Sequence, residues 1–165
     1  MELCFVRHGI AGEAGSAYPD DRLRPLTAEG TARMREAAAG LATLFRPKVI
    51  LTSPLVRARQ TAAILSEAYP GVPVQETEVL AWAALPELCR ALNAAGTDAV
   101  LAVGHEPHLS AAIGYLVADS ERAGILMKKG AAALVACEAA AMGMGELQWL
   151  LQPAALRALG RSRTR

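Results

Sequence analysis

The sequence predicts an α/β protein, a three-layer α/β/α sandwich whose sheet is mostly parallel and carries an antiparallel hairpin at one edge. Short continuous apolar runs alternate with helical segments, which is typical of parallel strands covered on both faces. The last two apolar runs are joined by the turn at residues 142–145, which predicts the hairpin. A length of 165 residues with 53% hydrophobic content fits one domain. We assign residues 1–152 to this domain and residues 153–165 to a basic C-terminal tail.

The N-terminal segment predicts a strand, a loop and a helix. Residues 1–7 form a buried strand, and residues 9–26 form a long loop rich in Gly, Pro and Asp. Thr27 is a candidate N-cap for a helix that runs to about Phe45, because Met34 and the apolar residues that follow it fall on one face.

The next segment repeats the alternation. Residues 49–51 form a second strand, and a helix follows over residues 55–69, where Pro70-Gly71 ends it. Residues 72–74 are a candidate short strand.

The C-terminal half supplies the rest of the sandwich. Its expected elements are helices over residues 86–95 and 107–117, and strands over residues 99–103, 131–137 and 146–151. Past residue 153 the chain is rich in arginine, and we expect a frayed, solubilising terminus there.

Composition excludes several classes of protein. The formal net charge of +1 provides no global field for nucleic acid or an anionic membrane, so neither is an expected partner. No apolar stretch approaches the roughly 20 residues that span a bilayer, and the apolar start is too short for a secretory signal, so we expect a cytoplasmic protein.

The three cysteines are far apart, which suits neither a disulfide framework nor a zinc site. None of them starts a Cys-x5-Arg phosphatase motif. We find no Asp-x-Asp motif after an early strand and no Gly-x4-Gly-Lys-Ser/Thr loop, so no metal and no cofactor are expected.

Three predicted strands end in residues that can carry chemistry. Arg7-His8-Gly9 ends the first, the stretch from Ser53-Pro54 to Gln60-Thr61 follows the second, and Gly104-His105 ends a third. Open α/β folds gather their ligands at the carboxyl ends of strands. With Arg24 from the long loop, the set holds three arginines and two histidines, which suits a dianionic phosphoryl group better than a neutral ligand.

These motifs and the turn Arg24-Pro25-Leu26-Thr27 resemble those of the histidine phosphatase superfamily. The short length and that turn are most similar to the small SixA-type phosphohistidine phosphatases. The resemblance runs from Met1 to about Leu151, with the four motifs in the family's order. It implies a cytoplasmic hydrolase in signal transduction that acts on a phosphohistidine-bearing protein, either a phosphotransfer domain or a phosphocarrier.

His8 is the expected nucleophile. A neutral imidazole can attack phosphorus and form a phosphohistidine that water later hydrolyses. Neighbouring arginines favour this state because positive charge disfavours the imidazolium form.

Arg7 and Arg57 are the expected phosphate clamp, since a planar guanidinium donates two parallel hydrogen bonds to phosphate oxygens. Arg24 is expected to reach the same pocket, with a surface position as its alternative. Arg59, two residues past Arg57, is expected to be a solvated surface arginine.

His105 is expected to donate a hydrogen bond to the phosphoryl group and to stabilise the charge that develops during transfer. Ser53 has two open roles, since it can bind the phosphate or cap the following helix. His108 and Glu106 adjoin His105, but we expect structural roles for both.

Larger relatives acting on phosphate esters carry a glutamate after the third strand region as general acid. Residues 79–84 contain no acid here, although Glu76, Glu78 and Glu87 are close enough in sequence for a shifted register. Imidazole is a far better leaving group than an alkoxide and needs no dedicated carboxylic acid. The missing glutamate therefore favours phosphohistidine over sugar phosphates.

Two alternatives stay open. One is a small-molecule phosphate-ester phosphatase or mutase of the same superfamily, with Glu78 or another displaced acid. The other is a non-catalytic phosphate-binding module that senses phosphorylated partners.

Overall fold

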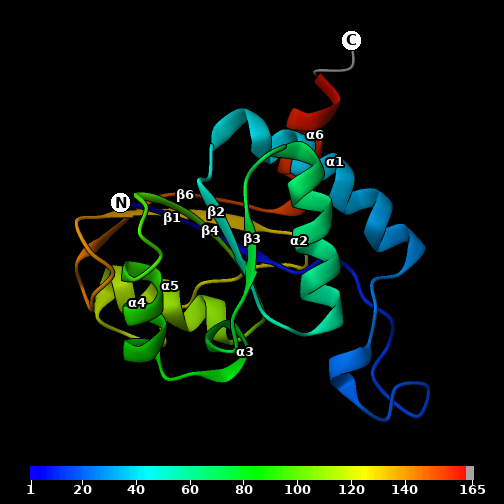
Figure 1. The fold of residues 1–165 in the computed structure, drawn as a ribbon, viewed down its shortest axis with the longest axis horizontal. Coiled ribbons are helices and arrows are strands. Elements are labelled where there is room, and N and C mark those ends of the chain that lie inside the picture. Colours follow the sequence, from blue (N-terminus) through cyan, green and yellow to red (C-terminus); the bar gives the residue numbers. More distant parts are fainter. Residues whose placement is uncertain (163–165) are drawn as a thin grey trace.

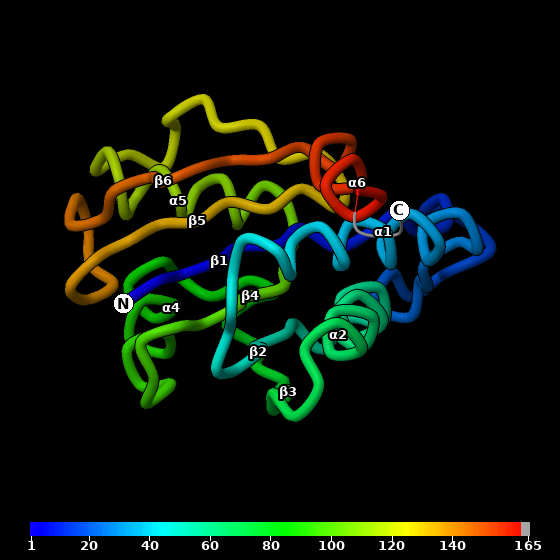
Figure 2. The backbone as a smooth tube through the Cα atoms, turned by 90° about the horizontal axis from the view of Figure 1, so that it is seen from above, coloured from blue at the N-terminus to red at the C-terminus, as the bar shows by residue number. Residues whose placement is uncertain are grey.

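The computed structural model describes residues 1–162, and over these residues it contains one six-stranded sheet with the order β3-β2-β4-β1-β5-β6 (Figure 2). The first four strands in this order run parallel, whereas β5 is antiparallel to β1 and β6 is antiparallel to β5. The predicted mostly parallel sheet with an antiparallel edge hairpin is confirmed. The strands are β1 (Glu2–Arg7), β2 (Val49–Thr52), β3 (Val74–Glu76), β4 (Ala99–Gly104), β5 (Ala132–Cys137) and β6 (Gly145–Leu151).

Helices cover both faces of the sheet, which confirms the three layers (Figure 1). On one face lie α1 (Ala28–Leu44), α2 (Val56–Ala68) and α6 (Pro153–Ser162). On the other lie α3 (Val79–Trp82), α4 (Leu85–Asn93) and α5 (His108–Ala118). Each face has its own hydrophobic cluster, and β4 is buried along its whole length because it lies inside the sheet with helices on both sides. Within residues 1–162, each helix is too short or too polar to cross a bilayer.

The register of the parallel strands positions the site. Arg7 at the end of β1 pairs with Gly104 at the end of β4, and Thr52 at the end of β2 pairs with Val103. The three strands therefore stop at the same edge of the sheet. The residues that follow them emerge there together, although they are distant along the chain.

The expectation of a frayed terminus is wrong for residues 153–162, which form α6 against α1; residues 163–165 lie outside the described residues. Leu156 is buried in the core. A Cβ atom on Gly40 would meet the carbonyl of Leu156, and one on Gly160 would meet the carbonyl of Glu36, so the two helices approach backbone to backbone. The prediction of a frayed terminus rested on the arginine content of this segment. The sequence also contains a helix signal, because Pro153 stands at the first helical position and alanine and leucine residues follow it.

Two smaller differences concern the segment after α2. Strand β3 covers residues 74–76 rather than 72–74, and the sequence analysis missed the single turn of α3. All three residues of β3 are exposed, so no apolar alternation marks its register.

Candidate active site

The long loop after β1 is fastened to α2 at both ends. The Gly9 N–H donates to the Thr61 hydroxyl oxygen at 3.1 Å, and the Leu26 N–H donates to Gln60 Oε1 at 2.7 Å. Thr61 in turn donates to the carbonyl of Arg57 at 2.7 Å. Gln60 and Thr61 of the sequence motif therefore connect this loop to α2, the helix that contains Arg57.

His8 is buried, with 5% of its surface exposed. Its Nδ1–H donates to the carbonyl of Gly9 at 2.7 Å, so in the neutral ring Nε2 keeps its lone pair. Burial lowers the pKa of His8 to about 3, and the nearby His105, Arg57 and Arg7 also lower it, whereas the bond to Gly9 acts against these effects. At neutral pH His8 is therefore a neutral imidazole, with its hydrogen on Nδ1 and a lone pair on Nε2.

His105 lies beside His8, with 5.1 Å between the ring centroids. Its Nε2 is 2.8 Å from the hydroxyl oxygen of Ser53, which also accepts the Leu55 N–H at 3.3 Å. Ser53 therefore bonds to the turn that precedes α2 and does not cap the helix, since the N-cap position, Leu55, has no side-chain hydrogen bond. Its contact with His105 is one that the sequence analysis did not predict. Burial lowers the pKa of His105 to about 4, and Arg57 adds to this shift, so this ring is neutral as well.

The three predicted arginines converge on the same edge of the sheet. Arg7 donates through Nη1 to the carbonyl of Met127 at 2.7 Å, and Arg57 is almost fully buried in the first turn of α2. Arg24 donates through Nη1 to the carbonyl of Gly12 at 2.9 Å, and its side chain is only 14% exposed. Arg24 is therefore largely buried in this region, and its contact with a phosphoryl group stays a prediction.

Unpartnered donors make this edge a candidate anion site. Across residues 1–162, five buried side-chain nitrogen or oxygen atoms lack a hydrogen-bond partner, and three of them are Arg7 Nε, Arg57 Nε and His105 Nδ1. Buried polar groups in native proteins are nearly always hydrogen-bonded, so such a cluster calls for a ligand. If Ser53 donates its hydroxyl hydrogen to Nε2 of His105, Nδ1 carries the ring hydrogen and all three nitrogens are donors. A phosphoryl group has the charge and the acceptor oxygens to satisfy them.

Residues next to these have the structural roles expected of them. His108 is partly buried and its Nε2 donates to the carbonyl of Ala83 at 2.9 Å. Glu106 binds the hydroxyl and the N–H of Ser110 in the first turn of α5, which is favourable at a helix N-terminus.

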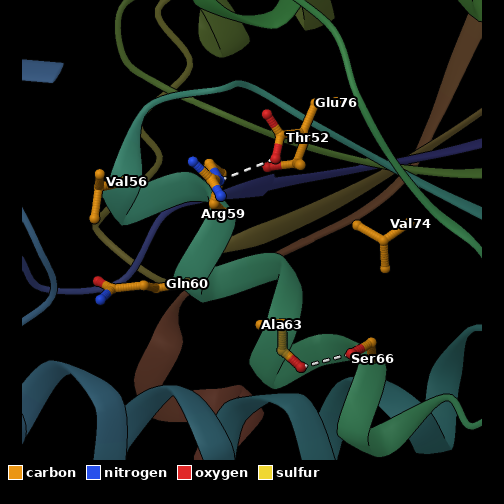
Figure 3. Close-up of a pocket in the computed structure, with 8 residues that line it drawn as sticks. All are labelled: Thr52, Val56, Arg59, Gln60, Ala63, Ser66, Val74 and Glu76. Atoms are coloured by element: carbon orange, nitrogen blue, oxygen red, sulfur yellow. Dashed lines mark hydrogen bonds and ion pairs between the residues drawn. The ribbon is translucent and has the colours of Figure 1, made fainter. Parts of the chain in front are cut away.

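A groove of about 540 Å³ lies on the other side of α2, against β3 (Figure 3). Arg59 and Glu76 form an ion pair of 2.9 Å in its wall. The side chain of Arg59 is 55% exposed, in agreement with the predicted surface role. The predicted nucleophile, clamp arginines, His105 and Ser53 do not line this groove, whereas the candidate acid Glu76 does.

Asp21 is the residue that sequence reasoning missed. Its carboxylate contacts both Arg24 and Arg57. The available signal was the spacing of three residues between Asp21 and Arg24 in the loop, which is too common to be noticed alone.

The histidines predict an unusual pH dependence. Both folded-state pKa values lie below the value of about 6.5 for an exposed histidine. The unfolded chain therefore binds protons that the folded chain does not, so the free energy of unfolding should fall as pH drops below about 6.5, and continue to fall until the folded rings titrate near pH 3–4.

NMR of the histidine ring carbons between pH 8 and pH 5 checks this prediction. The His8 and His105 signals should not move, and urea unfolding should show lower stability at pH 5 than at pH 7, with a smaller difference in His105→Gln. A His8 signal that titrates near pH 6.5 would contradict it.

A buried pair of neutral histidines lies with arginines at the strand ends of an α/β sheet, an arrangement suited to a phosphoryl group. The family model described as histidine phosphatase superfamily (branch 1) matches residues 3–88. The chain therefore belongs to the histidine phosphatase superfamily, and this membership implies phosphatase activity.

Individual proteins are also similar to this chain. An uncharacterized protein of Picosynechococcus sp. is 41% identical over 114 residues, which are 66% of this chain and 68% of the relative. The protein histidine phosphatase SixA solved with tungstate is 23% identical with a TM-score of 0.81, covering 94% of this chain and 99% of its own. The SixA structure from Nakamurella multipartitia is 27% identical with a TM-score of 0.75, covering 93% and 96%. The chain is of the SixA type.

A structure with a small-molecule ligand is also similar in fold. The phosphoserine phosphatase of Entamoeba histolytica in complex with 3-phosphoglyceric acid is 14% identical with a TM-score of 0.70, and the match covers 90% of this chain and 95% of that protein. The fold alone therefore does not decide between protein and small-molecule substrates.

Proposed function

We propose that this chain is a phosphohistidine phosphatase that removes phosphate from a protein phosphohistidine through a covalent intermediate on His8. The observation that supports it is the set of three buried nitrogens without partners, Arg7 Nε, Arg57 Nε and His105 Nδ1, beside the unprotonated His8. The arginines bind the non-bridging oxygens, and His105 donates to the oxygen on which charge develops. No step requires a metal.

The first step forms a bond from His8 Nε2 to phosphorus and breaks the P–N bond of the substrate. When the other ring nitrogen of the substrate is protonated, the leaving group is a neutral imidazole and takes no further proton. In the second step water attacks the phosphoryl group on His8 and the bond from phosphorus to Nε2 breaks. The oxygen and both protons of the water leave in dihydrogen phosphate, and His8 returns to the neutral ring with its hydrogen on Nδ1.

The positions of the acidic side chains favour this substrate over an ester. An alkoxide leaving group requires a proton, since the pKa of its conjugate acid is comparable to the ~15.7 of water. The candidate acids Glu76 and Glu78 are exposed and bind Arg59 at 2.9 Å and Arg22 at 3.3 Å. Imidazole, with a conjugate acid near ~6.5, leaves without such help.

The test compares kcat/KM for a phosphohistidine-bearing phosphotransfer domain with kcat/KM for a panel of phosphate esters. We expect a preference of about 100-fold or more for the phosphohistidine protein, and Glu78→Gln should leave its turnover unchanged.

The second candidate is a small-molecule ester phosphatase that uses Glu78. Two observations support it: the similar fold of the phosphoserine phosphatase, and the contact of Glu78 with Arg22, which follows Asp21 in the loop over residues 9–26. Ester turnover above that of phosphohistidine, abolished by Glu78→Gln, would establish this candidate and reject ours. Measurable phosphate binding without turnover of either substrate class would indicate a binding module.

A further inference from the structure

A carboxylate for which the proposed reaction has no chemical role lies among the arginines of the phosphate clamp. Asp21 belongs to a short 3-10 helix, η1 (Asp21–Leu23), near the end of the loop over residues 9–26. Its Oδ2 is 2.9 Å from Arg57 Nη2, and its Oδ1 accepts from Arg24 Nε at 2.8 Å. Its backbone carbonyl accepts from Arg57 Nη1 at 2.8 Å. One residue thus engages both terminal nitrogens of Arg57.

These contacts determine the orientation of the Arg57 side chain. A guanidinium group is rigid and planar, so two bonds at its terminal nitrogens also fix the direction of its remaining N–H groups. Nε of Arg57 is buried and unpartnered, which leaves it for the phosphoryl group. Arg24 is held in the same way, between Asp21 at Nε and the carbonyl of Gly12 at Nη1.

The charge at the site also depends on Asp21. Arg7, Arg24 and Arg57 are the cations of the clamp, and the Asp21 carboxylate is the counter-ion that Arg24 and Arg57 share. Arg7 has a different carboxylate near it, Glu106, whose charge favours the charged form of Arg7. Without the carboxylate, Arg24 and Arg57 would face each other with no counter-ion.

We propose that Asp21 is a positioning residue of the phosphate clamp. Its contacts hold Arg57 and Arg24 in the orientation that binds a dianionic phosphoryl group. The proposal rests on the proposed function, because it gives Asp21 no contact with the reacting atoms. A general-acid role is unsuitable for this carboxyl, since the hydrogen bond from Arg24 and the charge of Arg57 hold its pKa below the ordinary range. Its contacts are with terminal nitrogens of Arg57, so the carboxylate and the phosphoryl group use different N–H groups.

The variants Asp21→Ala and Asp21→Asn test this role, and Glu67→Gln is the matched control. Glu67 binds Arg35 at 3.2 Å on the exposed surface, so the control removes one carboxylate from an arginine pair outside the site. The measurements are kcat and KM on the phosphohistidine protein, inhibition by tungstate, and the melting temperature. Tungstate binding reports on the clamp without any chemical step.

We expect Asp21→Ala to lower kcat/KM and weaken tungstate binding by about tenfold or more. Without the carboxylate, the Arg57 side chain is no longer held in its binding orientation before the phosphoryl group arrives, and ordering it costs part of the binding free energy. Asp21→Asn should lose less, since its amide oxygen can still accept from one arginine. The melting temperature should change no more than in Glu67→Gln, whose kcat/KM should stay within twofold.

A decrease in kcat/KM of less than fivefold in Asp21→Ala, or tighter tungstate binding, would overturn the proposal. A decrease in kcat/KM that is fully explained by the fraction of unfolded variant would overturn it as well. The proposed function fails separately. If the wild type hydrolyses esters and not phosphohistidine, the proposed function is rejected. The same variants are then measured on the ester and with tungstate, and these measurements still show whether Asp21 positions the arginines.

Discussion

The variant His8→Ala is expected to lose turnover of a phosphohistidine protein by roughly 10⁴-fold or more, the scale on which removal of a nucleophile lowers kcat. The reason is specific to its geometry. Nδ1 of His8 is committed to the carbonyl of Gly9, so Nε2 is the nitrogen that can form the bond to phosphorus. Single-turnover assays with a ³²P-labelled phosphohistidine protein measure both the rate and the trapped intermediate.

Label should appear on His8 in the wild type and be absent from His8→Ala. Tungstate should still bind the variant, because the arginines remain in place. His108→Gln is the matched control, since His108 follows His105 by three residues and bonds to the carbonyl of Ala83 instead of the clamp. Equal dephosphorylation by the wild type and His8→Ala would eliminate the covalent mechanism.

Much of this site could be predicted because topology brings distant residues together without any knowledge of loop structure. Once residues 1–7, 49–51 and 99–103 are assigned as parallel strands, their carboxyl ends must share one edge of the sheet. The pairing of Arg7 with Gly104 and of Thr52 with Val103 shows this edge directly. Residues that directly follow a strand are therefore the easiest to place from sequence.

Residues on long loops are harder to place, and Asp21 is the clearest case. Its position depends on the path of an 18-residue loop over residues 9–26, and that path is set by bonds from Gly9 to Thr61 and from Leu26 to Gln60. None of these contacts has a local periodic signal. The same reason explains Ser53, whose contact with His105 depends on how β2 and β4 pair.

The sequence analysis misplaced β3 and missed α3, two short elements in which few residues are buried and the sequence therefore shows no apolar periodicity. The three residues of β3 are exposed at an edge of the sheet, and α3 is a single turn whose Leu80 alone is buried. Helix α6 is different, because its stability comes from tertiary contact. Gly40 and Gly160 permit its backbone to approach α1, and a pair of glycines 120 residues apart carries no signal in a single sequence.

The variant Arg57→Lys is expected to lower kcat/KM for the phosphohistidine protein by about 10²–10³-fold, the usual cost of removing one preorganised donor from an oxyanion site. Lysine keeps the positive charge, so the loss would measure geometry. The Arg57 side chain, 7% exposed, is held through both terminal nitrogens by Asp21, and an ammonium group cannot reproduce this planar arrangement and a free Nε–H together.

Arg59→Lys is the matched control two residues along the same helix. Its side chain lies in the groove against β3 and pairs with Glu76, so kcat/KM should change by less than about twofold. The comparison separates the clamp from general attraction, because both substitutions conserve charge and both sites lie on α2. If the two variants lost activity equally, the arginines of α2 would act through long-range charge, and the buried orientation of Arg57 would have no catalytic importance.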